Sequence, residues 1–321
     1  MEKFLARNRK RKGDPVHGWL ILNKPVETTS TQAVGIVKRL FNAQKAGHGG
    51  TLDPLADGIL PIAFGEATKT SAYAMDADKD YTFSIAWGAS TTTQDREGEV
   101  TQRSDARASK EDITRALKGF IGEIEQIPPQ FSAIKVNGER AYDLARDGET
   151  VELKSRSVEL FDASLDPAST EDEAIIHVTC GKGFYIRALV RDLAAELGLE
   201  GHVSTLKRTR VGAFSLAESV SLQALEEMET VEARRDLLVP IQSALDDIPA
   251  IEIAPANISR LRNGNDVLLL PHEMQAFQTM RAELQGEDSD DRLALALSDG
   301  DALALGEVRA GHFRPSRVFQ I

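Results

Sequence analysis

The chain has 321 residues, of which 41% are hydrophobic and 27% charged, the balance of an ordinary folded globular protein. No apolar stretch approaches the roughly 20 residues that span a bilayer, and the N-terminus lacks the apolar core of a secretory signal. A single cysteine, Cys180, excludes an intramolecular disulfide, and together these features predict a cytoplasmic protein without a membrane partner.

The net charge of −12 argues against nucleic-acid binding when it is taken alone. Contacts to phosphate need only local cations, however, and basic residues cluster at 7–12, at 38–39 and at 207–210. The charge therefore weakens an RNA-binding function without excluding it.

The N-terminal half is expected to begin with a basic arm at residues 1–15 and then to alternate between strands and helices. The run from Tyr81 to Trp87 is the strongest strand signal, because Tyr81, Phe83, Ile85 and Trp87 would share one face of a sheet. The elements predicted in chain order are a strand at 18–22, a helix that Ser30 or Thr31 caps and that runs through Phe41, a strand at 59–64, a helix at 66–75, a strand at 81–87 and a helix from Ser109 to Gly119.

The second half continues this irregular alternation without a repeated βαβ unit. Its predicted elements are a strand at 132–136, a turn at 137–138, a helix at 139–147, strands at 156–163 and 173–180, a helix at 184–197, a strand at 203–211 and a helix at 221–238. The pattern predicts a mixed α/β (α+β) fold with a largely antiparallel sheet and flanking helices. A change of composition at 246–249 indicates a linker, and residues 250–321 are expected to form short strands and turns in a small β-rich domain.

The stretch from Lys45 to Lys69 concentrates glycine, proline and charged side chains between two predicted helices. Its glycines allow a sharp turn close to a ligand, and Pro54 biases Asp53 toward an extended backbone. Functional side chains often occupy such loops, although an aspartate in this setting can equally serve to shape a turn. The stretch lacks a phosphate-binding GxxxxGK spacing, and the six histidines and one cysteine of the chain show no metal-ligand spacing, so no metal site is expected.

Residues 47–69, GHGGTLDPLADGILPIAFGEATK, resemble the catalytic motif of the TruB family of tRNA pseudouridine synthases. Four further blocks resemble this family in the same order and spacing: LILNKP at 20–25, IPPQFSAIKVNGERAYDLAR at 127–146, CGKGFYIRALVRDLA at 180–194 and HVSTLKRTRVGAF at 202–214. Two positions depart from the family pattern, since Asp57 stands where threonine is usual and Thr92 where aspartate is frequent. Both departures bear on local hydrogen bonding rather than on the nucleophile.

The resemblance implies an enzyme that isomerises uridine-55 in the T loop of tRNA to pseudouridine, by base flipping and an aspartate nucleophile. It implies a pseudouridine synthase catalytic domain at 16–248 and a PUA-like RNA-binding domain at 249–321, with RNGNDV at 262–267 as the C-terminal match. The expected partner is the T arm and elbow region of tRNA. No cofactor, no obligate protein partner and a monomeric state are expected.

Asp53 is the expected nucleophile, because a carboxylate is ionised at neutral pH and can form a covalent intermediate with either the base or the sugar. The family match pairs Arg187 with Asp53, whereas the alternative is an arginine on the solvent face of a helix. Tyr81 is expected to stack on the flipped uracil, against the alternative of core packing. Tyr185 is expected to line the uracil pocket.

Three further residues are expected to contact the substrate because of the resemblance. His48 would contact the RNA where the target base has left the loop, and its alternative is a turn histidine bound to a carbonyl. Leu206 would touch the substrate, although a core position is the default for any leucine. Lys24 would contact phosphate or stabilise the Asp53 loop. Cys180 is expected to be a small buried side chain rather than a nucleophile.

Two other classes of function compete with an RNA isomerase. The first is a tRNA-binding or RNA-folding module without catalysis, which an Asp53→Ala protein would test by separating binding from isomerisation. The second is an aspartate-dependent hydrolase of small nucleosides, which would turn over free uridine and would need neither the C-terminal domain nor the basic clusters.

Overall fold

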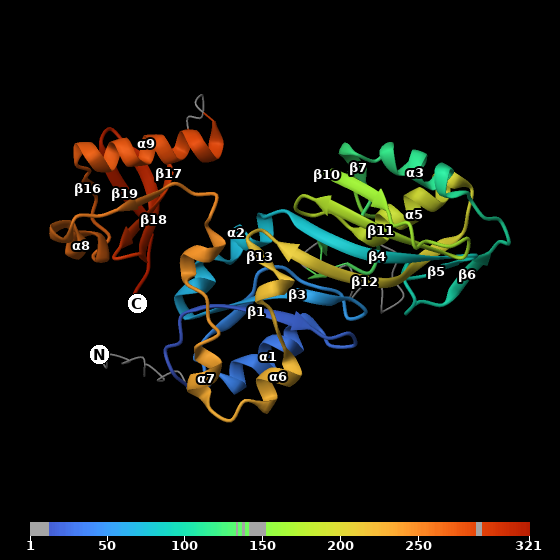
Figure 1. The fold of residues 1–321 in the computed structure, drawn as a ribbon, viewed down its shortest axis with the longest axis horizontal. Helices are drawn as coiled ribbons and strands as arrows, with labels where there is room; N and C mark the ends of the chain where they lie inside the picture. Colours follow the sequence, from blue (N-terminus) through green and yellow to red (C-terminus); the bar gives the residue numbers. More distant parts are fainter. Residues whose placement is uncertain (1–12, 133, 137–138, 141–151, 287–290) are drawn as a thin grey trace, which may run out of the picture.

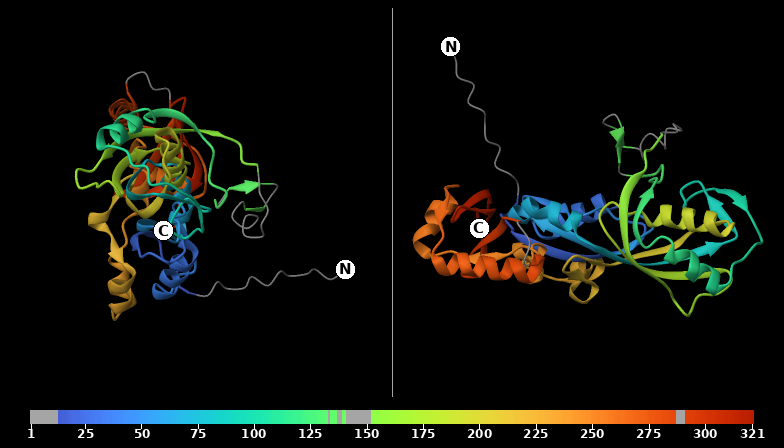
Figure 2. Two further views of the ribbon diagram at one scale, coloured as in Figure 1. Left: turned by 90° about the vertical axis from the view of Figure 1, so that its right-hand side faces the viewer. Right: turned by 90° about the horizontal axis from the view of Figure 1, so that it is seen from above.

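Two β-sheets of unequal size lie side by side along the long axis of the chain, which is shown here as a computed structural model (Figures 1 and 2). The structure describes residues 13–132, 134–136, 139–140, 152–286 and 291–321. The larger sheet and most helices come from the N-terminal three quarters of the chain, and the smaller sheet comes from the C-terminal quarter.

The larger sheet has ten strands in the order β14-β1-β3-β12-β4-β11-β10-β7, with β13 paired to β12 and β2 paired to β3. Only the β1–β14 and β3–β12 pairs are parallel, so the predicted largely antiparallel sheet is confirmed. Its strands are β1 (Gly18–Lys24), β2 (Ala46–His48), β3 (Asp57–Phe64), β4 (Lys79–Trp87), β7 (Gly122–Gln126), β10 (Arg156–Leu165), β11 (Glu173–Cys180), β12 (Gly201–Val211), β13 (Phe214–Ser215) and β14 (Val220–Ser221).

Helices flank this sheet as predicted, with α3 and α5 near one end and α1, α6 and α7 near the other (Figure 1). The helix at 30–41 begins one residue earlier than predicted, because Thr29 is its N-cap and forms a capping box with Gln32. The helical segments are α1 (Ser30–Leu40), η1 (Gly65–Thr70), α2 (Ser71–Asp76), α3 (Lys110–Lys118), α5 (Ile186–Leu197), η2 (Leu216–Glu218), α6 (Leu222–Glu227), α7 (Val231–Arg235) and η3 (Ile241–Ala244).

Strand β4 forms the centre of the larger sheet, and its predicted two faces are confirmed. Phe83, Ile85 and Trp87 are buried in the main core cluster, and Tyr81 packs against that cluster from a half-buried position. Strands β11 and β12 pair with β4 along nearly its whole length, one on each side. The strand therefore carries Tyr81 at a central point of the sheet, where neighbouring strands hold its backbone.

Strands β1 and β3 are buried on both faces, which explains the continuous apolar run at 59–64. Leu20, Leu22, Leu60 and Ile62 are among the residues that belong to the core under the helices. The alternate residues belong to a second cluster, which also contains residues of the C-terminal sheet: Trp19, Ile21, Ile59, Ala63, Leu295, Ala302, Leu305 and Phe319. The C-terminal sheet thus covers the second face of these two strands.

The C-terminal sheet has the order β15-β17-β18-β19-β16 and confirms the predicted small β-rich unit. Residues 250–321 are not only strands and turns, however, because two helices also form there. Prolines at the first helical positions, Pro255 and Pro271, were the missed start signals. The elements are β15 (Ala250–Glu252), α8 (Pro255–Arg262), β16 (Val267–Leu268), α9 (Pro271–Gln285), β17 (Leu293–Ser298), β18 (Asp301–Arg309) and β19 (His312–Val318).

Several predicted boundaries were wrong. The helix at 66–75 divides into η1 and α2, and the helix at 221–238 divides into α6 and α7 because residues 228–230 are not helical. The helix expected at 139–147 starts in residues that form strand β9 (Glu139–Arg140), which pairs with β8 (Lys135–Val136), and residues 141–147 lie outside the described part of the chain.

The sequence interpretation also missed a small hairpin and a sheet edge. The hairpin consists of β5 (Ala89–Thr91) and β6 (Val100–Arg103), and β7 is the edge strand next to β10. These strands are short and contain few apolar residues, so their period-2 pattern is weak. Among the described residues, no helix is long and apolar enough to cross a membrane.

Candidate active site

The loop between β2 and β3 carries Asp53 and is held from behind by side chains of β1 and α1. The Ser30 hydroxyl donates to the Leu52 carbonyl at 3.0 Å and accepts from the Leu52 amide at 2.9 Å. The Lys24 ammonium, which is fully buried, donates to the carbonyls of Pro25 and Thr28 at 2.8 and 2.7 Å and reaches the Pro54 carbonyl at 3.5 Å. Side chains thus hydrogen-bond to the backbone of Leu52 and Pro54, the residues on either side of Asp53, and fix its position.

Asp53 and Arg187 form the ion pair that the resemblance implies. The Arg187 Nη2 atom lies 2.9 Å from Asp53 Oδ2, and the side chains are 5% and 34% exposed, respectively. The guanidinium also donates to the Phe131 carbonyl at 2.8 Å and to the Thr93 carbonyl at 3.2 Å. The alternative of an arginine on the solvent face of α5 is thus wrong, and the partly exposed carboxylate is held by a buried cation.

Asp95 is a further acidic residue of the site that the sequence interpretation missed. It is buried, and its Oδ2 atom lies 3.7 Å from Arg187 Nε. Its other oxygen accepts from the Thr93 hydroxyl at 2.5 Å and from the Glu97 amide at 3.0 Å. The TTTQDREG stretch contained a signal for this role, since an aspartate with threonines shortly before it and a glycine shortly after it is typical of a structured turn. Asp95 places Arg187 between two carboxylates.

The charge of Asp53 acts on the hydroxyls of both tyrosines that the sequence analysis predicted for the site, Tyr81 and Tyr185. Burial raises the pKa of the Tyr81 hydroxyl above its ordinary value, and the Asp53 charge adds to this effect. Burial likewise raises the pKa of Tyr185, again with a contribution from Asp53. Tyr185 is the N-cap residue of α5, and its backbone amide donates to the Gln126 side chain at 2.8 Å. The candidate site therefore joins residues from the Asp53 loop, β4 and the start of α5.

The other three predicted residues occupy different surroundings. His48 is half-buried on β2 and pairs with Ile62 of β3. Leu206 is buried in the main core, paired with Phe83, so the structure supplies the core packing that is the default for leucine. Lys24 touches loop carbonyls, and burial lowers the pKa of its ammonium to about 8 despite the opposing charges of Asp57 and Asp53. Their contacts with a substrate stay predictions.

The two departures from the family pattern both have local partners. Asp57 forms an ion pair with Lys207 of β12, with Oδ2 and Nζ 3.1 Å apart. Thr92 closes the turn between β5 and β6, where its amide donates to the Glu99 carbonyl at 2.9 Å and its hydroxyl accepts from the Glu99 amide at 3.2 Å. Within the described part of the chain, neither residue forms a hydrogen bond or an ion pair with Asp53.

Lys69, at the end of the catalytic motif, contacts the C-terminal sheet instead of the site. Its ammonium pairs with Glu66 at 2.5 Å and donates to the Val318 carbonyl at 2.7 Å. The Glu66 carboxylate accepts from the Gln320 amide at 2.8 Å, so the motif and strand β19 are joined by polar contacts as well as by the shared core.

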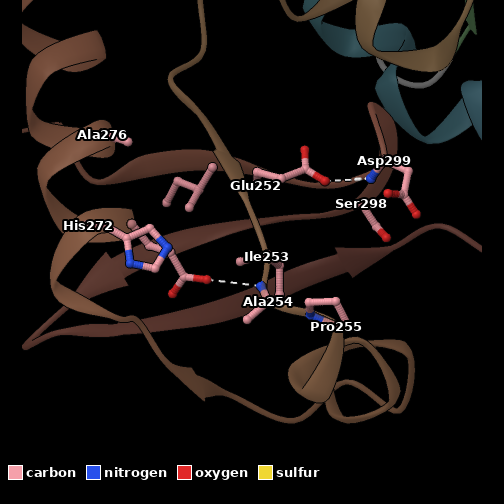
Figure 3. A pocket seen from close by; sticks show the side chains of 10 residues that line it. Glu252, Ile253, Ala254, Pro255, His272, Ala276, Ser298 and Asp299 are labelled. Carbon is pink, nitrogen blue, oxygen red and sulfur yellow. Dashed lines mark hydrogen bonds between the residues drawn. The ribbon is translucent and has the colours of Figure 1, made fainter.

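A hollow of about 310 Å³ lies in the C-terminal part, away from Asp53 (Figure 3). Two of its carboxylates already accept backbone hydrogen bonds, since Glu273 binds the Ala254 amide at 2.9 Å and Glu252 binds the Asp299 amide. His272 and Ser298 complete its polar lining. Residues 13–132, 134–136, 139–140, 152–286 and 291–321 contain no group of three or more His, Cys, Asp or Glu side chains that could hold a metal ion.

Two family models match consecutive parts of the chain. The first, the N-terminal domain of TruB family pseudouridylate synthases, matches residues 38–186, and the second, the C-terminal domain of tRNA pseudouridylate synthase B, matches residues 187–246. Among curated proteins, tRNA pseudouridine synthase B of Caulobacter vibrioides is 53% identical over 313 residues, covering 98% of this chain and 99% of that protein. The protein of the same name from Rhizobium johnstonii is 47% identical over 322 residues, covering 98% and 100%.

Solved structures support the fold. A chain in the crystal structure of a Cbf5–Nop10–Gar1 complex superposes with a TM-score of 0.69 at 22% identity, covering 95% of this chain and 84% of that one. A chain in the structure of an H/ACA RNP bound to a substrate RNA containing 2′-deoxyuridine gives 0.68 at 20% identity, covering 100% and 94%. The two family models together match residues 38–246, and the curated relatives match the chain over nearly its full length, so the chain belongs to the TruB family of pseudouridylate synthases.

Proposed function

We propose that this isomerase converts uridine-55 in the T loop of tRNA to pseudouridine, with Asp53 as the nucleophile. The observation that carries the proposal is the Asp53 carboxylate, partly exposed on a fixed loop and paired at 2.9 Å with the buried Arg187. The names of the relatives support tRNA as the substrate. The TruB resemblance of the motif around Asp53 supports the choice of uridine.

The reaction breaks the bond between C1′ of the ribose and N1 of uracil and forms a bond between C1′ and C5. The C5 proton leaves and N1 gains a proton, so no atom is lost and no electrons are supplied from outside. A carboxylate can attack covalently to separate these two steps. Arg187 and the loop contacts would hold the attacking oxygen in place, which lowers the barrier by orientation.

The target base must leave the T loop to reach Asp53, because a stacked uridine is not accessible to a protein side chain. Tyr81 and Tyr185 would receive the flipped uracil, and aromatic side chains stack on bases with useful energy. His48 would contact the RNA that the base has left, with Leu206 and Lys24 as further contacts. We propose that the chain does this as a monomer and without a protein partner.

The RNA contact would be shared between two domains, a catalytic domain at 16–248 and a PUA-like domain at 249–321, preceded by the basic arm at 1–15. Arg262 of the RNGNDV stretch is exposed at the end of α8, which supports a phosphate contact there. Residues of both proposed domains belong to one hydrophobic cluster. The proposed boundary therefore divides the functions of the two parts, although their cores are continuous.

The test uses unmodified tRNA transcripts and maps pseudouridine by chemical labelling and primer extension. We expect a single modified position, uridine-55, and no product with Asp53→Asn, which keeps the side-chain shape but removes the charge. Asp57→Asn is the matched control, because it removes a similarly exposed carboxylate four residues away and should leave product formation intact. Appreciable turnover by purified Asp53→Asn, or modification at another uridine, would contradict the proposal.

A further inference from the structure

Arg208 on β12 is almost completely buried and binds three backbone carbonyls around the catalytic loop. Its exposed fraction is 1%, although its neighbours in the sequence are the basic residues Lys207 and Arg210. Nε donates to the Ile59 carbonyl at 2.8 Å, and Nη2 and Nη1 donate to the carbonyls of Gly50 and Thr51 at 3.1 and 3.3 Å. Gly50 and Thr51 precede Asp53, and Ile59 follows it, so one side chain joins the two ends of the loop.

The same guanidinium lies against the proposed uracil platform. Arg208 and Tyr81 are cross-strand partners in the β12–β4 pair, which places their side chains on one face of the sheet. The Arg208 charge acts on the Tyr81 hydroxyl and lowers its pKa, against the larger opposite effect of burial. Arg208 therefore binds the loop of the nucleophile and also interacts with the hydroxyl of the tyrosine across from it.

The backbone brings Arg208 to this place by an unusually close approach. Arg208 pairs with Gly58 in the parallel β12–β3 join, and a Cβ atom on Gly58 would lie 2.2 Å from the Arg208 carbonyl oxygen. A bulge in β12 between Arg208 and Arg210 then turns the strand, and Arg210 instead pairs with Asp80 at 2.7 Å. Among the described residues no carboxylate forms an ion pair with Arg208, and its three donor groups bind backbone carbonyls.

We infer that Arg208 is a positioning residue of the reaction, which sets the distance between the Asp53 loop and Tyr81. The inference rests on the proposed nucleophile. Its place in a basic cluster suggests a phosphate contact, but a buried guanidinium whose three donor groups all bind protein carbonyls cannot serve the RNA backbone. The contact depends on the planar fork of arginine, because Nε, Nη1 and Nη2 each donate to a different carbonyl. Lysine carries all its donors on one nitrogen at the end of a flexible chain and cannot keep this fixed geometry.

The test compares Arg208→Lys with Arg234→Lys, a matched control far from the site. Arg234 is also buried and also binds three carbonyls, those of Leu225, Met228 and Leu40. Three quantities are measured for each protein: the urea midpoint, the tRNA Kd and the single-turnover rate at saturating enzyme. We expect both variants to lose stability, but only Arg208→Lys to lose about 100-fold in the single-turnover rate, as loop misplacement does, with its Kd within about threefold of wild type.

Equal rates for the two variants at a temperature where both are folded would make Arg208 merely structural. A weaker Kd with an unchanged rate would make it an RNA contact, and either result overturns the inference. Arg208→Gln, which buries no unpaired ammonium, replaces Arg208→Lys if the latter does not fold. If neither folds while Arg234→Lys does, Arg208 is a folding residue and the inference fails. Activity of Asp53→Asn tests the nucleophile separately and does not depend on these results.

Discussion

Lys24 is the residue whose burial has the clearest consequence for stability. Its ammonium is buried from solvent behind the Asp53 loop, where it donates to backbone carbonyls. Burial lowers its pKa from 10.5 to about 8. In the unfolded chain the lysine returns to its ordinary pKa. Between these two values the unfolded state holds a proton that the folded state has lost.

We therefore predict that the free energy of unfolding rises with pH between about 8 and 10.5 because of Lys24. The contribution is up to about 3 kcal/mol across this window and is absent below it, where both states are protonated. Urea unfolding of wild type and Lys24→Met at pH 7.5, 9 and 10 measures it, since the difference between the two proteins should grow with pH. Burial also lowers the pKa of Lys79 to about 8. Lys79 is present in both proteins, so its contribution cancels in the difference between them. A difference that stays constant would show that Lys24 is not desolvated.

At the scale of the elements, the parallel join between β3 and β12 determines where the site residues meet. β3 follows the Asp53 loop directly, and β12 carries Arg208 and pairs with the Tyr81 strand. Gly58 permits this join because its φ of +102° and its missing side chain are both required there. A side chain at this point would meet backbone atoms, which cannot move aside as a flexible side chain could.

We predict that Gly58→Ala lowers the free energy of unfolding by at least about 3 kcal/mol, from backbone strain and overpacking together. Gly47→Ala is the control, because it lies in the same motif but a Cβ there would have no atom within 4 Å. It should change stability by less than about 1 kcal/mol. Urea midpoints of the two variants give the comparison. A Gly58→Ala protein as stable as Gly47→Ala would mean that the β3–β12 join can relax.

At the scale of the whole molecule, the two sheets depend on one another. On the second face of strands β1 and β3, the C-terminal residues Leu295, Leu305 and Phe319 are buried beside Trp19 and Ile59, together with short helical segments of the N-terminal part. Lys69 and Glu66 add polar contacts to β19 at the same boundary. Removing the C-terminal sheet would therefore expose an apolar surface of the catalytic part.

We predict that truncation after Pro249 lowers the urea midpoint and shifts the emission of Trp19 to the red, because the indole loses its cover. The chain has two tryptophans, so Trp87→Phe isolates the Trp19 signal and Trp19→Phe supplies a control in which Trp87, within the main core, should not shift. In the fraction that stays folded by circular dichroism, tRNA binding should weaken, while the single-turnover rate on a T-arm stem-loop at saturation stays within about tenfold. If the truncated protein keeps the wild-type urea midpoint and Trp19 emission, the C-terminal sheet does not stabilise the catalytic part. If the single-turnover rate falls by several orders of magnitude, the C-terminal sheet contributes to the active site.

The sequence by itself determined the features whose signals lie within a short window. Alternation along 81–87 predicted β4 and its core face, Ser109 and Gly119 bounded α3, and the motif around Asp53 identified the loop that the structure pairs with Arg187. These predictions succeeded because side-chain period, capping and motif spacing are local properties of the chain. Tertiary packing overrode the local pattern at 221–238, where a single expected helix became α6 and α7.

Only the tertiary structure decided which charged residues are buried and what they contact. Arg208 looked like one of several surface cations, yet it binds Ile59, 149 positions away in the chain, whereas the partly exposed Lys207 and Arg210 pair with carboxylates. Asp95 lies near Arg187 in a turn, and a turn has no helical or strand periodicity from which this proximity could be predicted. Likewise, the apolar run at 59–64 predicted burial but not its partner, the C-terminal sheet. Burial of a charge depends on the dipoles and apolar surface that distant segments bring to it, and these meet only when the chain folds.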